Sequence, residues 1–92
     1  MDVLQADNGK KGRFYILVND VQEAEMTYTW AGTGRIIIDH TEVNEILKGR
    51  QAGKQMLMKA VAFAREKGIK IFPLCPFANS VFKKTPEIQD VL

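Results

Sequence analysis

Hydrophobic and polar residues alternate strictly between residues 23 and 30. Ala24, Met26, Tyr28 and Trp30 fall on one side of an extended chain, and glutamates and threonines occupy the positions between them. A period of two is typical of an antiparallel strand with one buried and one solvated face. The sequence therefore predicts a half-buried antiparallel strand over residues 23–30.

Two further strands are predicted beside this segment. Residues 14–18 are rich in β-forming residues, and Asn19-Asp20 suits a two-residue turn between them and the alternating segment. The Gly32–Gly34 turn leads into a third strand over residues 35–43, with three consecutive isoleucines near its start. Three hairpin-linked strands form a meander. Residues 1–11 are polar, so we expect a flexible start or a turn there.

The hydrophobic period changes after residue 50. Ala52, Met56, Ala60 and Phe63 recur at helical spacing, and Gly68 is placed to end the helix that they predict. Residues 69–75 form a fourth strand, which should lie parallel to the third because a helix connects the two. A short helix over residues 77–84 and a last turn at residues 85–87 follow. The expected fold is α+β, in the order β-β-β-α-β-α, with helices packed on a mostly antiparallel sheet.

Length and composition limit the chain to one domain, which we assign to residues 12–92. The chain has 92 residues and a mass of 10.4 kDa, with an ordinary hydrophobic content of 46%. No apolar run approaches the length of a membrane span, so no membrane partner is expected. The single cysteine, Cys75, excludes an internal disulfide and favours a cytoplasmic location. Too few cysteines and histidines are present for a structural zinc site, and we predict no metal.

Charge is distributed unevenly along the chain. The net charge is only +2, but residues 48–70 contain seven lysines and arginines against one glutamate. Such a local excess indicates an anionic partner, or else a solvated helix face. A nucleic acid is the less favoured partner, because the aromatic residues lie in the predicted strands and are not interleaved with the basic residues.

The segment between the third strand and the long helix has the features of a phosphate-binding loop. It consists of Lys48, Gly49, Arg50, Gln51, Ala52, Gly53 and Lys54. Free backbone amides and the helix dipole attract anions at a helix N-terminus, and glycines let a ligand approach the backbone closely. The spacing matches neither a Walker loop nor a dinucleotide fingerprint. A solvated loop is the alternative interpretation.

Two other segments carry residues that could do chemistry. His40, the only histidine, shares one face of its strand with Glu42, while Thr41 and Val43 share the other. Histidine can act as a base near neutral pH, although a lone histidine is more often a surface residue. Cys75 lies between a strand and a helix, where its pKa could be lowered, so we expect a thiol that solvent can reach. A buried, inert cysteine is the alternative.

Together, these segments resemble a family of minimal N-acetyltransferases in the GNAT superfamily. The resemblance rests on the motif over residues 40–43, the Leu47–Lys54 loop and the Pro73–Phe77 motif, and it covers residues 12–92. It implies that the loop binds the pyrophosphate of acetyl-CoA and that the third and fourth strands splay apart. Pantetheine would lie in that gap, beside the backbone of Thr41 and Val43.

The resemblance also implies a function, acetyl transfer from acetyl-CoA to an unidentified amine acceptor by a monomer or weak dimer. Two mechanisms are open. In direct transfer, His40 or Glu42 deprotonates the amine, and a backbone N–H near Val43 polarises the thioester. In the two-step route, Cys75 takes the acetyl group first, assisted by His40. A CoA-binding or sensing module with little turnover is the alternative function.

Overall fold

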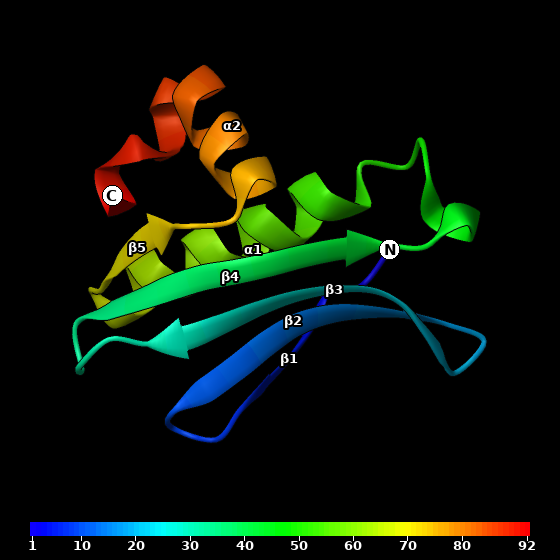
Figure 1. Ribbon diagram of the computed structural model, residues 1–92, viewed down its shortest axis with the longest axis horizontal. Coiled ribbons are helices and arrows are strands. Elements are labelled where there is room, and N and C mark those ends of the chain that lie inside the picture. Colours follow the sequence, from blue (N-terminus) through cyan, green and yellow to red (C-terminus); the bar gives the residue numbers. More distant parts are fainter.

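The computed structural model describes all 92 residues. They form a single five-stranded sheet with helices on one side (Figure 1). The elements are β1 (Leu4–Asp7), β2 (Lys11–Val18), β3 (Val21–Trp30), β4 (Arg35–Val43), the 3-10 helix η1 (Glu45–Leu47), α1 (Ala52–Lys67), β5 (Lys70–Pro73), α2 (Pro76–Lys84) and the 3-10 helix η2 (Pro86–Val91). The strands lie in sequence order, and only the β4–β5 pair is parallel. The predicted α+β fold is confirmed.

The predicted meander forms as the alternation requires. Ala24, Met26 and Tyr28 are buried in β3, and β2 contributes Phe14 and Ile16 to the same core. The turn between these strands is the Asn19-Asp20 pair, and both residues have positive φ angles, of 52° and 65°. Positive φ at both central residues is the geometry of a type I′ hairpin turn, whose twist matches that of the strands.

The N-terminus differs from the expectation for residues 1–11. Leu4–Asp7 forms β1, which pairs antiparallel with β2 from Leu4 opposite Tyr15 to Asp7 opposite Gly12. The side chain of Asp7 fixes this edge: its Oδ2 accepts hydrogen bonds from the Tyr28 hydroxyl at 2.5 Å and from Trp30 Nε1 at 2.9 Å. These partners are more than 20 residues away, so local sequence does not reveal the strand.

The Asp7–Tyr28 contact perturbs both groups. Burial and then the hydrogen bond to Asp7 raise the pKa of Tyr28 above its ordinary value. Burial alone would raise the pKa of Asp7, but the hydrogen bonds from Tyr28, the Gly9 amide and Trp30 outweigh it and lower that pKa. Asp7 is therefore held as a carboxylate in the folded protein.

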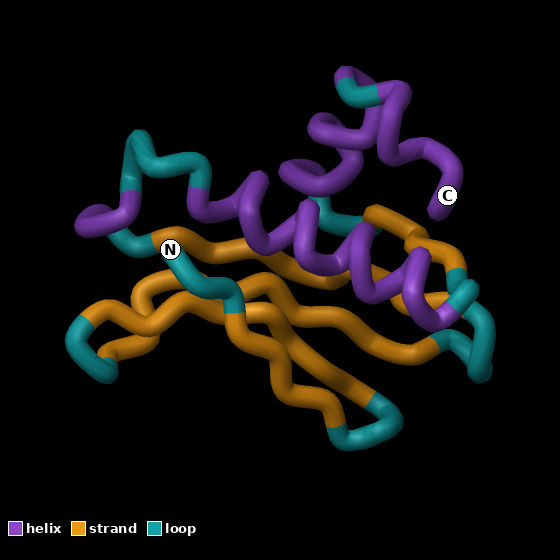
Figure 2. The backbone as a smooth tube through the Cα atoms, turned by 180° about the vertical axis from the view of Figure 1, so that it is seen from behind, coloured by secondary structure: helices purple, strands orange, loops and turns teal.

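Both α-helices pack on the same face of the sheet. Helix α1 lies behind β4 in Figure 1 and in front of the sheet in Figure 2, which is seen from the opposite side. Its buried residues, with those of α2 and η2, join the inward residues of the strands in one core of 21 residues. Gly68, at a φ of 66°, ends α1 as predicted. None of the helices combines the length and apolar content that a bilayer crossing requires.

The second face of the sheet carries no helix, and we call it the open face. Apart from the register shifts, the side chains on it alternate with the buried ones. In β2 to β5 they include Lys11, Arg13, Tyr15, Leu17, Glu23, Glu25, Thr27, Thr29, Arg35, Ile37, Asp39, His40, Glu42 and Phe72.

The parallel pair is shorter than the sequence predicts. β5 ends at Pro73 instead of continuing to residue 75, and its register with β4 runs only from Arg35 opposite Lys70 to Ile38 opposite Pro73. A proline has no amide hydrogen for further pairing. β4 continues beyond this point while the chain turns away into α2 (Figure 1). The predicted splay therefore begins after Ile38, and it creates a gap between β4 and α2.

Candidate active site

A β-bulge in β4 orients the side chains at the gap. Tyr28 lies opposite Ile38, but its neighbour Thr27 lies opposite His40, so Asp39 is an extra residue in β4. The extra residue inverts the alternation. Ile36 and Ile38 are buried before the bulge, whereas His40 and Glu42 beyond it are exposed on the open face. Thr41 and Val43 share the opposite face, as the alternation predicted, and the bulge turns that face toward the helices.

The bulge also decides which backbone groups face the gap. The Asn44 amide donates to the carbonyl of Glu23 at 2.8 Å, so amides at every second position before it are directed toward β3. Thr41 and Val43 lie at the positions between, and their amides point away from β3. No strand pairs with them, since β5 has already ended. The edge of β4 thus presents free hydrogen-bonding groups in a narrow gap.

The start of α1 supplies a second set of free amides. Gln51 precedes the helix in a left-handed conformation with a φ of 60°, and its side chain makes no capping hydrogen bond. The first backbone amide to bond back is that of Gln55, which donates to the carbonyl of Gln51 at 2.9 Å. The amides of Ala52, Gly53 and Lys54 are therefore free. Such amides and the helix dipole favour an anion at this position.

Positive side chains surround this helix start. Lys48 forms an ion pair with Glu45 at 2.9 Å, whereas neither Arg50 nor Lys54 is paired with a carboxylate. Gly49, at a φ of 80°, lets the loop turn sharply between η1 and Gln51. Two unpaired cations next to free amides give the loop the electrostatics of a phosphate-binding site.

A cavity of about 300 Å³ joins the helix start to the gap. Its walls contain seven of the nine residues predicted to bind the cofactor. These are Val43, Lys48, Gly49, Gln51, Ala52, Gly53 and Lys54. Thr41 and Arg50 lie outside its walls. Leu47, Phe77 and Val81 complete the cavity, and the sequence did not single out these three as site residues. Phe77 belongs to the Pro73–Phe77 motif, which is the signal that could have identified it.

Gly53 has a packing role that the sequence did not reveal. A Cβ atom at this position would lie 2.7 Å from Cζ and 3.0 Å from Cε2 of Phe77. The absence of a side chain therefore lets the Phe77 ring cover the first turn of α1. The glycine shapes the cavity through α2 as well as leaving its own amide accessible.

Cys75 is located where β4 and β5 part, but it is buried. Only 4% of the residue is exposed, which corrects the expectation of a thiol that solvent can reach. Its amide donates to the carbonyl of Ile38 at 2.9 Å, and its thiol donates to Thr41 Oγ1 at 3.3 Å. The structure thus brings Cys75 to Thr41. His40, which was expected to assist Cys75, extends from the opposite face of β4.

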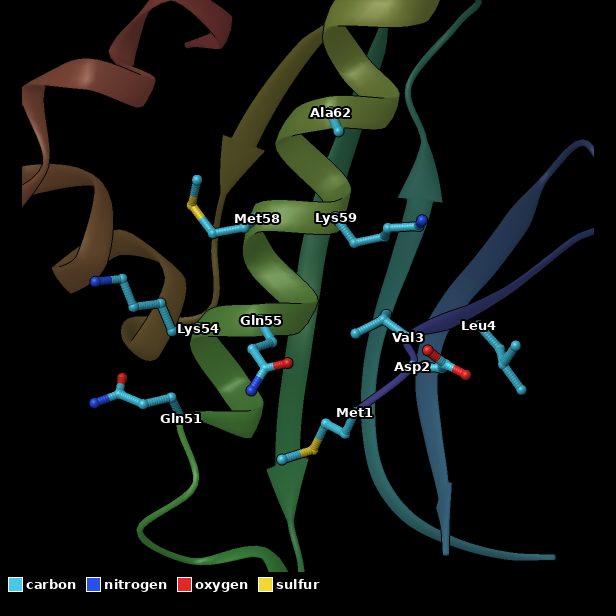
Figure 3. A pocket seen from close by; sticks show the side chains of 10 residues that line it. All are labelled: Met1, Asp2, Val3, Leu4, Gln51, Lys54, Gln55, Met58, Lys59 and Ala62. Atoms are coloured by element: carbon cyan, nitrogen blue, oxygen red, sulfur yellow. The ribbon is translucent and has the colours of Figure 1, made fainter.

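The largest cavity lies elsewhere. It measures about 800 Å³ and separates the N-terminal residues from the outer side of α1 (Figure 3). Met1–Leu4 form one wall, and Gln51, Lys54, Gln55, Met58, Lys59 and Ala62 form the other. It shares Gln51 and Lys54 with the smaller cavity but contains no residue of β4. None of its wall residues therefore belongs to the strand that borders the gap.

Comparison with known proteins agrees with this arrangement. The family model described as GCN5-related N-acetyl-transferase matches residues 13–91. Protein NATD1 of Danio rerio is 30% identical over 88 residues, which span 94% of this chain and 80% of that protein.

Two solved structures share the fold. The NMR structure of a GCN5-like putative N-acetyltransferase from Staphylococcus aureus superimposes with a TM-score of 0.76 at 36% identity, covering 98% of this chain and 85% of the other. The structure of AAC(6')-Iy in complex with the bisubstrate analog CoA-S-monomethyl-acetylneamine superimposes with a TM-score of 0.59 at 11% identity. This superposition covers 84% of this chain and 61% of AAC(6')-Iy. The first of these similarities and the family match extend over nearly the whole chain, and the protein belongs to the GCN5-related N-acetyltransferase family.

Proposed function

We propose that this protein transfers an acetyl group from acetyl-CoA to an amine acceptor. The observation that carries the proposal is the cavity at the start of α1, whose walls contain most of the residues predicted to bind the cofactor. AAC(6')-Iy, which shares the fold, holds a CoA-containing analog, so this fold accommodates the cofactor in at least one relative.

The cofactor would lie along the free backbone groups. The free amides of Ala52, Gly53 and Lys54 suit the pyrophosphate, and the side chains of Arg50 and Lys54 add positive charge. Pantetheine would then follow the unpaired edge of β4, where the amides of Thr41 and Val43 are available as partners. Val43 belongs both to this edge and to the cavity, which supports one continuous path.

The chemistry would take place where this path reaches the bulge. The amine nitrogen attacks the thioester carbonyl, the carbon–sulfur bond breaks, and CoA leaves as a thiolate that takes up a proton. The Val43 amide is suited to stabilise the oxygen that becomes negative in this step. His40 and Glu42 are exposed on the open face, so they can accept the proton of an amine that approaches from that face.

The burial of Cys75 supports direct transfer over the two-step route. An acetyl-cysteine intermediate requires the thiol to meet the thioester, and the Cys75 thiol is instead enclosed and bonded to Thr41. Cys75 and Thr41 then act as positioning residues that hold the gap open. The two-step route predicts an acetyl group on Cys75 that hydroxylamine removes, whereas direct transfer predicts no adduct and an active Cys75→Ala enzyme.

Calorimetry with CoA tests the binding site. Lys54→Glu places a negative charge at the helix start and should weaken CoA binding at least 10-fold, as expected for a charge reversal beside a phosphate. Lys59→Glu, on the same helix but outside the cavity, is the matched control and should bind normally. Equal affinities of the two variants would place the site elsewhere. Binding with no turnover on any amine would instead favour the sensing module.

A further inference from the structure

The start of α1 contains a strained residue that the proposed function leaves unexplained. Gln51 has a φ of 60° and a ψ of 28°, in the left-handed region of backbone conformations. A residue with a Cβ atom is disfavoured there, which is why glycine usually occupies such positions. The side chain of Gln51 offers no compensation, because the residue is exposed and makes no capping hydrogen bond. A non-glycine residue keeps this conformation only where its surroundings fix it, and such residues are frequent at functional sites.

Gln55 supplies the groups that fix this turn. Its backbone amide donates to the carbonyl of Gln51 at 2.9 Å, and its side-chain Nε2 donates to the carbonyl of Arg50 at 3.1 Å. Figure 3 shows the side-chain nitrogen of Gln55 directed toward the beginning of α1, whereas the side chain of Gln51 extends away from it. One residue therefore holds the carbonyl groups immediately before and after the strained position.

The Arg50 carbonyl is the acceptor that a longer helix would use. In an α-helix each amide donates to the carbonyl four residues earlier, so an extension of α1 toward the N-terminus would pair the Lys54 amide with Arg50. The left-handed turn at Gln51 prevents that extension. The side chain of Gln55 adds a competing donor at the same carbonyl. Together, the turn and this hydrogen bond keep the Lys54 amide free.

Gln55 acts on this amide from outside the proposed pyrophosphate site. The residue is half-buried, and it lines the cavity beside the N-terminal segment but not the cavity at the start of α1. A loss of CoA affinity on removal of its side-chain donor would therefore come from a change in the loop and not from a lost contact with the ligand.

We propose that Gln55 is a positioning residue for the pyrophosphate of CoA. Its side-chain amide holds the Arg50 carbonyl, which keeps Gln51 in the left-handed conformation and the Lys54 amide free before the cofactor arrives. This inference rests on the proposed function. A loop arranged in advance increases affinity, because the cost of ordering it is not subtracted from the free energy of binding.

Gln55→Met removes the side-chain donor and tests this role. Methionine has a similar length and helix preference but cannot donate a hydrogen bond. The affinity for CoA, measured by calorimetry, should fall about 5-fold, as expected for the loss of one ordinary hydrogen bond. An affinity equal to that of the unmodified protein would overturn the proposal.

Gln89→Met is the matched control. The Nε2 atom of Gln89 also donates to a backbone carbonyl, that of Phe82 at 2.8 Å, but Gln89 does not line the cavity at the start of α1. The control therefore loses the same kind of hydrogen bond and should bind CoA as the unmodified protein does. An equal loss of affinity in both variants would show a general effect on the fold and contradict a positioning role.

Glycine at position 51 separates the conformational role of Gln55 from other effects. Glycine adopts the left-handed conformation without strain and disfavours an extension of the helix. In the Gln51→Gly background, Gln55→Met should therefore change the CoA affinity by less than about 2-fold. A loss of about 5-fold in this background as well would mean that Gln55 does not act through the turn at Gln51, which contradicts the proposal.

Amide hydrogen exchange tests the loop without the cofactor. The Lys54 amide has no acceptor in the unmodified protein and should exchange rapidly. In Gln55→Met the Arg50 carbonyl becomes available to it, so the exchange of the Lys54 amide should slow about 5-fold or more. Unchanged exchange would overturn the positioning role. Failure of the unmodified protein to bind CoA would refute the proposed function while leaving this measurement interpretable.

Discussion

Replacing Gly53 by alanine separates the packing role of this glycine from any role in binding. The added Cβ would lie 2.7 Å from Cζ of Phe77, against an ordinary contact of about 3.4–4 Å, so the ring must retreat by about 1 Å. Overpacking of this kind costs about 1–3 kcal/mol. Alanine is favoured over glycine in a helix by about 0.5–1 kcal/mol. The variant should therefore be destabilised by about 1 kcal/mol.

The Phe77→Ala background should reverse the effect of this substitution. Without the ring there is no clash, and only the helix preference remains, so Gly53→Ala should stabilise that background by about 0.5–1 kcal/mol. The expected coupling between the two positions is then about 1–3 kcal/mol. Urea unfolding followed by the fluorescence of Trp30, the single tryptophan, measures all four free energies of unfolding.

The coupling energy between positions 53 and 77 shows whether the Phe77 ring is the reason for a glycine at position 53. If Gly53→Ala changes the free energy of unfolding equally in both backgrounds, within about 0.5 kcal/mol, the ring contact is not what requires a glycine. CoA affinity gives a second readout, because Phe77 lines the cavity that the displaced ring would alter. The single variant should bind CoA more weakly than the unmodified protein.

Three other predictions concern the N-terminal edge, the loop and the cysteine. Hydrogen bonds from Tyr28 and others lower the pKa of Asp7, so their stabilisation should be complete only well above the ordinary carboxyl pKa of 3.8 and should be lost as the pH falls through the lowered pKa. Asp7→Asn should remove this part of the acid dependence in urea titrations at several pH values. Gln51→Gly should stabilise the fold by about 0.5–1 kcal/mol, because Gln51 has a φ of 60° that glycine adopts without strain. Gln55→Gly lies inside the helix and should destabilise the fold by a similar amount; calorimetric melting of both variants tests the difference. The alkylation rate of buried Cys75 should be much lower than that of free cysteine, and it should rise in urea as the protein unfolds. A fast reaction in the native protein would contradict the burial.

Most elements follow from the sequence because their signals are local. The alternation in residues 23–30 fixes which side of β3 is buried, since side chains in a strand point to opposite faces in turn. The apolar stripe and Gly68 specify α1 and its end, because both act within a few residues. The loop that lines the cavity was identified for the same reason: glycines and basic residues before a helix are a local feature.

Other features depended on residues distant in the sequence. β1 exists because Asp7 reaches Tyr28 and Trp30, and nothing within residues 1–11 reveals those partners. The enclosure of Cys75 depends on Thr41, 34 residues earlier, and the need for a glycine at position 53 depends on Phe77. In each case the decisive contact joins two elements that only the packing of α1 and α2 on the sheet brings together.

The bulge in β4 sets which face of the sheet His40 and Glu42 occupy, and it depends on pairing with β3 as well as on the sequence of β4 itself. The sequence alone established that His40 and Glu42 share one face, because they are two residues apart in a strand. Strict alternation would have placed them with the buried Ile36 and Ile38. Only pairing with β3 introduces the extra residue, Asp39, that turns His40 and Glu42 to the open face. The reason is physical: side-chain order within a strand is a property of its own backbone, whereas register and bulges are set by the neighbouring strand and by which face the helices cover.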